Sequence, residues 1–527
     1  MNMNLTIDIN ASDFHNTRLH PDTIVYHASS SDPIVMTSFE HARNPANYRS
    51  LFFPFAYIVT NHVTGEHLLI RDHLGLRPLY YAYTQGRLIF GDNIPDLLKQ
   101  FPSPPGFLET EVAHLFADVH NYTDNTLYRG IYRVEPGHMV HVMPDGRITK
   151  SVFWQLEPQG PTLYYRDDRE YLLHFKALMQ ESMRLATDGV DEIAAEFSAG
   201  MDSTAIYGTC VDLGLNPTLF MHAALPGSPD AMIYNDSYER AFFEYFRQAK
   251  IHRLYADGFD AIQVFKDYAA WFAGPAPYIF ELFSHHIHQA VSTTGHKRLL
   301  SGFGGDQGVS EHVPARFILP FLIKNKQFRR AWLESGSGSI MRRLLLLAQC
   351  THPLVNHITH TMRDLKKEIH KQVVSHHPYH RKYFKTLREV EWSMLQGPQS
   401  HEIRMRIEYS SVVAKKMGFE YRYPLLYPKL LEFFLSLPIE QKRHQGRGRY
   451  LMRRYLTHLM PSVPFEKYEK KEGLSILPAT VEMFKAQWEQ GAYQDTFQLI
   501  HLKNKSKNQS QHKLMIETIQ AFMLNEV

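Results

Sequence analysis

Cysteine is scarce in this sequence, with only Cys210 and Cys350 among 527 residues. Two cysteines exclude a disulfide framework and fit a reducing compartment. The longest apolar runs, such as residues 51–59 and 344–348, are too short to span a bilayer. The first residues also lack the basic and apolar regions of a signal peptide, so we expect a cytoplasmic protein with no membrane partner.

No large excess of charge of one sign is present over the whole chain, whose formal net charge is +3. The total therefore gives no reason to expect nucleic acid as a partner. Residues 313–397 differ from the rest, because they contain 15 Lys/Arg against 5 Asp/Glu. Two interpretations stay open for this basic segment: solvated helix faces over a sheet, or a surface for an acidic peptide.

The chain is longer than one hydrophobic core supports, so we expect two domains. Residues 157–162 are rich in Pro and Gly, and they divide a first domain over residues 1–155 from a second over residues 163–527. Beyond this linker, helical and short apolar segments alternate. That alternation is typical of a parallel sheet with helices on its faces.

Short β-branched and aromatic runs predict strands in the first domain, over residues 55–60, 67–70 and 78–82. Turn residues such as Asn61 and Gly65 separate these strands. The pattern favours an α+β domain built on stacked antiparallel sheets.

Residues 196–204 lie between a predicted buried strand over residues 191–195 and a helix predicted to open over residues 205–211. A strand that turns through small residues into a helix directs unpaired N–H groups and the positive helix end at one point, which favours an anion. Asp202 would repel a bare phosphate, so we expect a divalent cation between them. The Gly-Lys pair of a Walker loop is absent, and a plain Ser-capped helix is the alternative.

A second glycine-rich turn, residues 301–307, follows the apolar pair Leu299 and Leu300. Its three glycines let the backbone approach a ligand closely, and Asp306 supplies a second carboxylate. Two carboxylates beside pyrophosphate oxygens suit Mg²⁺. An ordinary glycine turn is the alternative for this segment taken alone.

Residues 196–204 resemble the pyrophosphate loop S-G-G-x-D-S of ATP pyrophosphatases, with Ala199 in place of the first loop glycine. Residues 301–307 resemble the S-G-x-G-x-D-E segment of asparagine synthetases, whose aspartate shares Mg²⁺ with the aspartate of the first loop. Residues 225–230 look like a loop of that family that lies beside the nucleotide. The resemblance implies Asp202 and Asp306 as metal ligands, and ATP binding by Ser198, Ala199, Gly200, Met201, Asp202, Ser203, Leu225, Gly302, Phe303, Gly304 and Arg449.

Residues 71–81 resemble the R-D-x-x-G-x-x-P-L-Y-Y signature of the glutamine amidotransferase domain in asparagine synthetases. This implies an Ntn-like antiparallel sandwich, followed by an adenine-nucleotide alpha-hydrolase-like (PP-loop) α/β domain with helical additions. That family releases ammonia from glutamine with an N-terminal cysteine. Here position 2 is Asn2, and neither cysteine lies in the first domain. We therefore expect a retained scaffold and an amine that comes from elsewhere.

The resemblance also implies roles for three residues of the second domain. Arg449 stands where the family has a basic residue that reaches the phosphates. Glu408 stands where β-lactam synthetases place the glutamate of a catalytic dyad, so it is expected to act as general base. Lys471 is expected to stabilise charge on the adenylate. Two departures are visible: Phe303 replaces the tyrosine of that dyad, and Tyr468 replaces a family arginine.

The implied activity is ATP-dependent amide-bond formation through an acyl-adenylate, with release of AMP and pyrophosphate. Lasso-peptide macrolactam synthetases resemble this chain in length, in the cysteine-less first domain and in the G-G-D form of the second loop. They join a peptide's N-terminal amine to an Asp or Glu side chain. We expect a peptide or small-molecule substrate, with a maturation protease and a leader-binding protein as candidate partners. A β-lactam synthetase-like or ammonia-dependent asparagine synthetase-like ligase, and a non-catalytic relative, are the alternatives.

Overall fold

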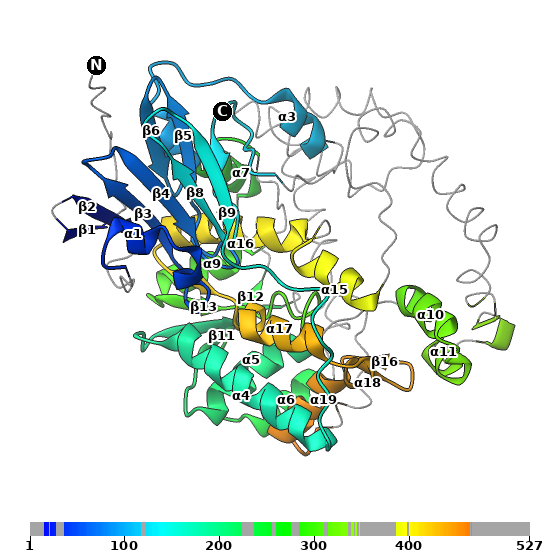
Figure 1. Cartoon of the computed structure of the whole chain (residues 1–527). Coiled ribbons are helices and arrows are strands. Elements are labelled where there is room, and N and C mark those ends of the chain that lie inside the picture. The colour runs from blue at the N-terminus through cyan, green and yellow to red at the C-terminus, as the bar shows by residue number, and fades with distance from the viewer. Residues whose placement is uncertain are drawn as a thin grey trace, which may run out of the picture.

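Figure 1 shows the early strands gathered in one part of the molecule and the later helices arranged around a second sheet. The computed structural model describes residues 15–20, 22–27, 36–116, 123–223, 237–255, 260–275, 284–309, 315–335, 339–341, 343–344, 347, 386–397, 400–463 and 465. Within these ranges, no helix is both long enough and apolar enough to cross a membrane.

The first part contains two stacked antiparallel sheets. Its strands are β1 (His15–His20), β2 (Thr23–His27), β3 (Ala56–Asn61), β4 (Glu66–Arg71), β5 (Tyr80–Thr84), β6 (Arg87–Gly91), β7 (Tyr132–Arg133), β8 (His138–Val142) and β9 (Ile148–Val152). The larger sheet has the order β1-β2-β3-β4-β8-β9, and the smaller has the order β6-β5-β7. Ile58 and Leu69 of the larger sheet share a core with Tyr81 of the smaller one. Tyr57 and Val59 point the opposite way, as alternation along a strand requires, and join the core of the second part.

Short helices complete the first part: α1 (Phe39–Ala42), η1 (Pro45–Tyr48), α2 (Ile94–Leu98) and α3 (Glu109–Phe116). Side chains cap two of them, because Ser38 accepts a hydrogen bond from the N–H of His41 and Asn93 accepts one from the N–H of Asp96. The strands predicted over residues 55–60, 67–70 and 78–82 correspond to β3, β4 and β5, with ends displaced by one or two residues.

The second part is built on a five-stranded parallel sheet. Its strands are β10 (Ile193–Glu196), β11 (Thr218–Ala223), β12 (Ile251–Tyr255), β13 (Arg298–Leu300) and β14 (Glu420–Arg422). Their order is β12-β11-β10-β13-β14, and all neighbouring pairs are parallel. The chain leaves β10 toward β11 on one side and later returns to β13 on the other side. The order therefore reverses between β10 and β13, which is where ligands bind in such sheets.

Helices make up most of the rest of the second part (Figure 1). They are α4 (Asp168–Thr187), α5 (Met201–Asp212), α6 (Ser237–Tyr245), α7 (Ala261–Phe272), α9 (His285–Thr293), α10 (Ala315–Lys324), α11 (Phe328–Glu334), α15 (Leu387–Leu395), α16 (His401–Met417), η3 (Pro424–Leu426), α17 (Pro428–Ser436), α18 (Ile439–Lys442) and α19 (Tyr450–Leu459). The hairpin of β15 (Arg443–His444) and β16 (Arg447–Gly448) precedes α19. Helices α5 and α19 approach closely, because a Cβ at Gly208 would lie 2.9 Å from Leu459.

One sequence prediction needs correction in this part. The helix expected to open at residue 205 begins at Met201, so Asp202 and Ser203 lie in its first turn. The two parts share one hydrophobic core, which contains Tyr57 of the first sheet and Phe175 of α4. The domain boundaries predicted at residues 155 and 163 stay a prediction.

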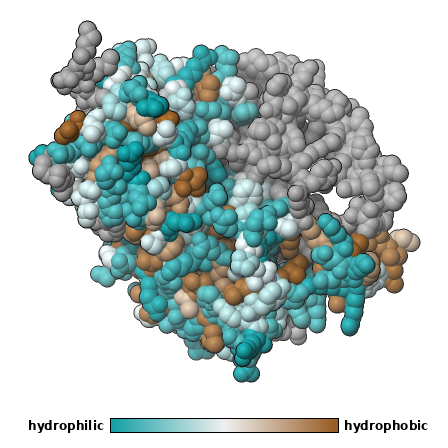
Figure 2. All heavy atoms as spheres, in the orientation of Figure 1, coloured by the Kyte–Doolittle hydropathy of each residue, from teal (hydrophilic) through white to brown (hydrophobic). Residues whose placement is uncertain are grey.

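Apolar atoms gather at one end of the described surface, where α10 and α11 lie (Figure 2). Phe328 and Leu333 of α11 are among the exposed large apolar residues, as are Ile340, Met341 and Leu344. Most of the basic segment over residues 313–397 lies outside the described residues, so its two interpretations stay open.

Candidate active site

The first loop turns from the carboxyl end of β10 into α5. Gly200 caps α5 without a side-chain hydrogen bond, and the helix directs its positive end at the loop. Ser203 organises the loop, because its Oγ accepts from the N–H of Ser198 at 3.3 Å and donates to the carbonyl of Gly200 at 3.1 Å. The loop therefore presents a helix N-terminus and two hydroxyl groups at the point where the strand order reverses.

Ala199 adopts a left-handed backbone conformation, with φ of +52°. A methyl group is accommodated without backbone strain only where φ is negative, and at Ala199 φ is positive. A non-glycine residue in this region is strained by about 1–2 kcal/mol. The loop thus keeps the backbone shape that glycine allows, although the residue is alanine.

The second loop lies close against the first at its glycines. A Cβ at Gly305 would lie 2.4 Å from Oδ1 of Asp202, and a Cβ at Gly302 would lie 3.0 Å from the backbone nitrogen of Ser203. Gly304 has φ of +91°, and its missing side chain leaves room for Leu426. These glycines allow the two loops to lie in contact.

Arg449 joins the acidic residues of the two loops. One of its guanidinium nitrogens lies 3.5 Å from Oδ2 of Asp202, and another forms an ion pair with Asp306. Its side chain is only 5% exposed. Asp202, Asp306 and Arg449, separated by up to 247 positions in sequence, therefore meet at one point beside the N-terminus of α5.

A buried ion pair beneath the loops was missed from the sequence. Glu196, the last residue of β10, accepts hydrogen bonds from Arg406 at 3.0 Å and from the Tyr421 hydroxyl at 2.6 Å. It also accepts one from the Ser301 hydroxyl, which in turn accepts from the N–H of Phe303 at 3.2 Å. Glu196 thus fastens the start of the second loop to the strand that carries the first. A carboxylate at the end of an otherwise apolar strand was the available signal.

Phe303 contacts aromatic and cationic groups on the inner side of the second loop. Its ring centroid lies 6.1 Å from that of Tyr423, and the Arg406 guanidinium carbon lies 5.8 Å from its centre. Arg406 is 5% exposed and is held by Glu196, so the ring covers a buried ion pair. The phenyl group offers no proton at this position.

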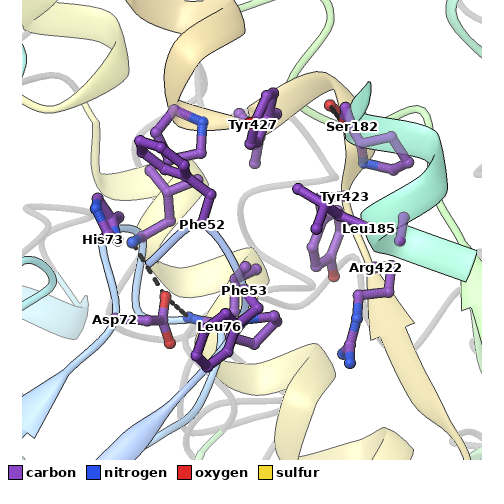
Figure 3. A pocket seen from close by; sticks show the side chains of 16 residues that line it. Phe52, Phe53, Asp72, His73, Leu76, Ser182, Leu185, Arg422, Tyr423 and Tyr427 are labelled. Atoms are coloured by element: carbon purple, nitrogen blue, oxygen red, sulfur yellow. Dashed lines mark hydrogen bonds between the residues drawn. The ribbon is translucent and has the colours of Figure 1, made fainter. Parts of the chain in front are cut away.

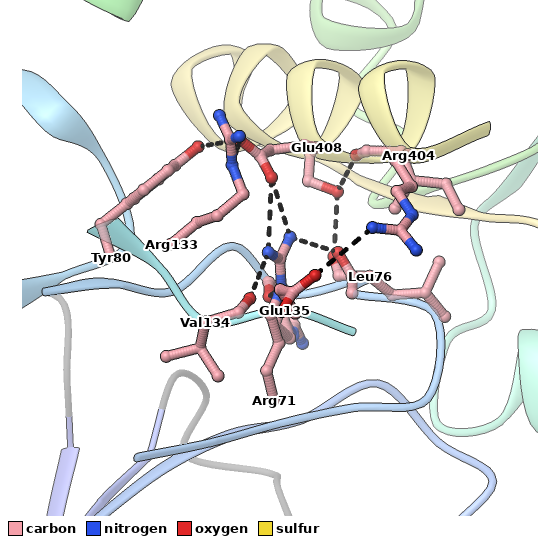
Figure 4. Close-up of polar contacts among 12 residues, drawn as sticks. Arg71, Leu76, Tyr80, Arg133, Val134, Glu135, Arg404 and Glu408 are labelled. Carbon is pink, nitrogen blue, oxygen red and sulfur yellow. Dashed lines mark hydrogen bonds and ion pairs between the residues drawn. The ribbon is translucent and has the colours of Figure 1, made fainter. Parts of the chain in front are cut away.

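Glu408 faces the first domain, as Figure 4 shows. Its carboxylate accepts from the Tyr80 hydroxyl at 2.7 Å, from two nitrogens of Arg71 at 3.3 Å, and from Nε of Arg133 at 3.3 Å. Arg71 also donates to the carbonyl of Val134 at 2.8 Å. We call Glu408 and its three first-domain donors the interdomain clamp.

This geometry changes the role expected for Glu408. Burial alone would raise its pKa, but the guanidinium groups of Arg133 and Arg71 and the Tyr80 hydrogen bond outweigh burial, and the pKa lies below its ordinary value. A carboxylate held ionised by two arginines is a weak base. Its contacts therefore favour a structural role over the general base that the sequence suggested.

Two sequence-predicted site residues, Leu225 and Lys471, lie outside the described residues, as does Tyr468. Their expected contacts with the nucleotide and adenylate stay predictions. Of the remaining candidates, Asp202 and Asp306 contact Arg449.

Comparison with known proteins agrees with this two-part arrangement. A glutamine amidotransferase domain model matches residues 16–154, and an asparagine synthase model matches residues 174–495, more than half of the chain. The chain belongs to the asparagine synthase family. This family uses ATP and Mg²⁺ to form carbon–nitrogen bonds, with AMP as a product.

The individual relatives are distant. Asparagine synthetase [glutamine-hydrolyzing] 1 of Bacillus subtilis is 20% identical over 472 residues, covering 83% of this chain and 70% of the relative. Amidase chyE of Penicillium rubens is 26% identical over 162 residues, or 30% of this chain and 23% of the amidase. Amidase chry2 of Gibberella zeae is 25% identical over 155 residues, which cover 29% of this chain and 22% of the amidase. The chain therefore matches less than a quarter of the length of either amidase.

Two solved structures share limited similarity with the chain. Glutamine phosphoribosylpyrophosphate amidotransferase from B. subtilis, complexed with ADP and GMP, has a TM-score of 0.15 and 12% identity, with 46% of this chain and 63% of that chain covered. The U34-tRNA thiolase NcsA from Methanococcus maripaludis has a TM-score of 0.20 and 11% identity, and the match covers 49% of this chain and 88% of the thiolase chain. At these TM-scores neither structure adds to the description of the fold.

Proposed function

We propose that this protein activates a substrate carboxylate with ATP and transfers the acyl group to an amine. The substrate carboxylate attacks the α-phosphate, pyrophosphate leaves, the amine displaces AMP from the acyl-adenylate, and an amide remains. The observation that carries this proposal is the meeting of Asp202, Asp306 and Arg449 at the uncapped N-terminus of α5.

The residues present suit ATP and Mg²⁺. Two carboxylates are the ligands that Mg²⁺ takes beside phosphate oxygens, and Asp202 and Asp306 are both within reach of one guanidinium group. Bound Mg²⁺ supplies neutralisation of the phosphate charge. The N–H groups of the first turn of α5 and the Ser198 hydroxyl orient the pyrophosphate, and Arg449 binds its oxygens.

The amine comes from an organic substrate in this proposal. Both cysteines lie outside residues 16–154, which match the amidotransferase domain, and Cys210 is buried in α5. No thiol within that domain serves glutamine hydrolysis. We therefore propose lasso-peptide cyclisation, in which the N-terminal amine of a ribosomally made peptide joins an internal Asp or Glu side chain. A maturation protease and a leader-binding protein are the partners that this reaction implies.

Pyrophosphate exchange tests the carboxylate activation. Purified protein is incubated with ATP, Mg²⁺, labelled pyrophosphate and linear peptides with Asp or Glu a few residues past the N-terminus. We expect label to enter ATP, and Asp202→Asn or Asp306→Asn to reduce the rate at least about 100-fold. Asp212→Asn at the other end of α5, where Asp212 pairs with Lys176, is the matched control and keeps the rate. Absence of both exchange and ATP binding in the wild type would favour a non-catalytic relative.

The 472-residue match to a bacterial asparagine synthetase favours one second candidate, an asparagine synthetase that uses ammonia. Mass spectrometry of the products separates the two reactions. A peptide that loses one water and resists carboxypeptidase past the ring supports cyclisation. Asparagine formed from aspartate and ammonium, with no change in the peptide, supports the second candidate.

A further inference from the structure

A chain of buried polar side chains leads from α9 to Glu196, the last residue of β10. His288 of α9 is fully buried, and its Nε2 lies 2.7 Å from the hydroxyl oxygen of Tyr421 on β14. The Tyr421 hydroxyl in turn lies 2.6 Å from Oε1 of Glu196. The other ring nitrogen of His288, Nδ1, lies 3.4 Å from the hydroxyl oxygen of Tyr268 on α7. Two helices and two strands of the second part therefore meet in one polar network.

The ring of Tyr421 is held in place by its neighbours. It stacks on the ring of Tyr423, with centroids 5.4 Å apart and planes at 5°, and Tyr423 lines the pocket drawn in Figure 3. The ring of His288 stands at 88° to it, with centroids 5.6 Å apart. Tyr421 is only 4% exposed. Its hydroxyl can therefore change the direction of its hydrogen but not the position of its oxygen.

The single hydrogen of the Tyr421 hydroxyl points to Glu196. Arg406 lies 3.3 Å from that oxygen and can only donate, and the carboxylate of Glu196, which is paired with Arg406, can only accept. The Tyr421 oxygen therefore accepts from Arg406 and from His288. A ring nitrogen that donates carries a proton, so His288 has a proton on Nε2. In the neutral ring, Nδ1 is then the acceptor for the Tyr268 hydroxyl.

Glu196 connects this network to the second loop. Its other oxygen accepts from the Ser301 hydroxyl, and Ser301 Oγ accepts from the N–H of Phe303 at 3.2 Å. Gly302, between these two residues, lies against the backbone of Ser203 in the first loop. Hydrogen bonds in a buried chain strengthen one another, so loss of the bond from Tyr421 weakens the hold of Glu196 on Ser301.

We propose that His288 is a positioning residue for the candidate active site. It holds the Tyr421 hydroxyl toward Glu196, and Glu196 holds the start of the second loop, so His288 acts through two other side chains. Its effect on rate rests on the function proposed above, whereas the proton on Nε2 does not. A network that only stabilised the fold would change Tm and leave the rate below the unfolding transition unchanged.

Nuclear magnetic resonance spectra of the full chain, with isotope-labelled histidine rings, test the proton position without any substrate. At about pH 8, where an ordinary histidine is neutral, the signals of His288 are those that His288→Gln removes. We expect them to show a proton on Nε2 and none on Nδ1, and to shift in Tyr421→Phe, which removes the hydroxyl and keeps the ring. A proton on Nδ1, or signals that Tyr421→Phe does not move, would overturn the proposal.

Rates of pyrophosphate exchange test the positioning. We expect His288→Leu to lower the rate at least about tenfold, whereas His288→Gln, whose amide nitrogen donates from nearly the place of Nε2, keeps most of it. In a Tyr421→Phe background, His288→Leu should cause little further loss, because the link to Glu196 is already cut. His73→Leu is the matched control: His73 is buried and contacts the Arg49 carbonyl at 3.0 Å, so this variant lowers Tm but keeps the rate.

The possible outcomes separate this inference from the proposed function. A wild-type rate in His288→Leu, or the same loss from it with and without the Tyr421 hydroxyl, would overturn the positioning role. If His288→Leu does not fold, Tyr421→Phe decides the matter, since it removes one oxygen and should lower the rate as much. No exchange in the wild type would count against the proposed function, and the proton position on His288 then decides this inference by itself.

Discussion

Replacing Glu408 with glutamine separates a structural role from a catalytic one. Glutamine keeps the shape of the side chain and one acceptor for the Tyr80 hydroxyl, but it removes the charge that Arg71 and Arg133 share. Glu408 is 8% exposed at its side chain and Arg71 is 2% exposed. Breaking a buried ion pair by removing one partner costs about 3–5 kcal/mol. Because glutamine retains a hydrogen bond, we expect about 3 kcal/mol for Glu408→Gln.

Thermal unfolding of Glu408→Gln measures the structural role of Glu408, and steady-state kinetics of the same variant measure a catalytic role. A loss of about 3 kcal/mol lowers Tm by about 6 °C in domains of this size, with kcat close to that of the wild type below the transition. The double variant Glu408→Gln, Arg71→Met is expected to be less destabilised than the sum of the single variants, since each removes the partner of the other. Glu440→Gln, which breaks an exposed pair with Arg330, is the control and changes stability by less than about 1 kcal/mol.

The contribution of Glu408 to the stability of the fold depends on pH in a defined direction. The folded-state pKa of Glu408 lies below the ordinary value of 4.5, so its contribution to stability is fully present above about pH 4.5 and is lost as pH falls through the folded pKa. The difference in stability between wild type and Glu408→Gln should therefore shrink below about pH 4.5. The reasoning is refuted if Glu408→Gln keeps the wild-type Tm and lowers kcat 100-fold or more, which is the result that a general base predicts.

Three further predictions concern single positions. Ala199→Gly relieves the left-handed strain and should raise stability by up to about 1 kcal/mol in chemical denaturation, whereas Ala199→Val should lower it. Gly305→Ala places a Cβ against Asp202 and should abolish pyrophosphate exchange, while Gly106→Ala, with no atom near its Cβ, keeps it. Burial raises the pKa of Cys210, so mass spectrometry should find it unalkylated at pH 8 until denaturant is added.

The convergence of the two loops was predictable because it depends on topology alone. Carboxyl ends of neighbouring parallel strands lie at the same edge of a sheet, and β10 and β13 are neighbours. The order of two Gly-rich segments along the chain was therefore enough to bring Asp202 toward Asp306. The sign of φ at Ala199 was not predictable, because residue type gives only a preference and the surrounding loop overrides it.

The sequence argument did not address the face of α16 on which Glu408 lies. Residues two apart on a helix point about 200° apart, so Arg406 and Glu408 face opposite sides of α16. Arg406 reaches the candidate active site and Glu408 reaches the first domain. A shift of two residues along α16 therefore moves a side chain from the face toward the candidate active site to the face toward the first domain. The partners of Glu196 and Glu420 lie too far away in sequence for any local pattern to reveal them.

The two faces of α16 connect the first domain to the second loop. On one face, Arg406 holds Glu196, which holds Ser301 at the start of the second loop. On the other face, Glu408 is neutralised by Arg71 and Arg133 of the first domain. Without those arginines a buried carboxylate would be left unpaired on the helix that supports the second loop. The first domain therefore contributes to the stability of the helix that supports the second loop.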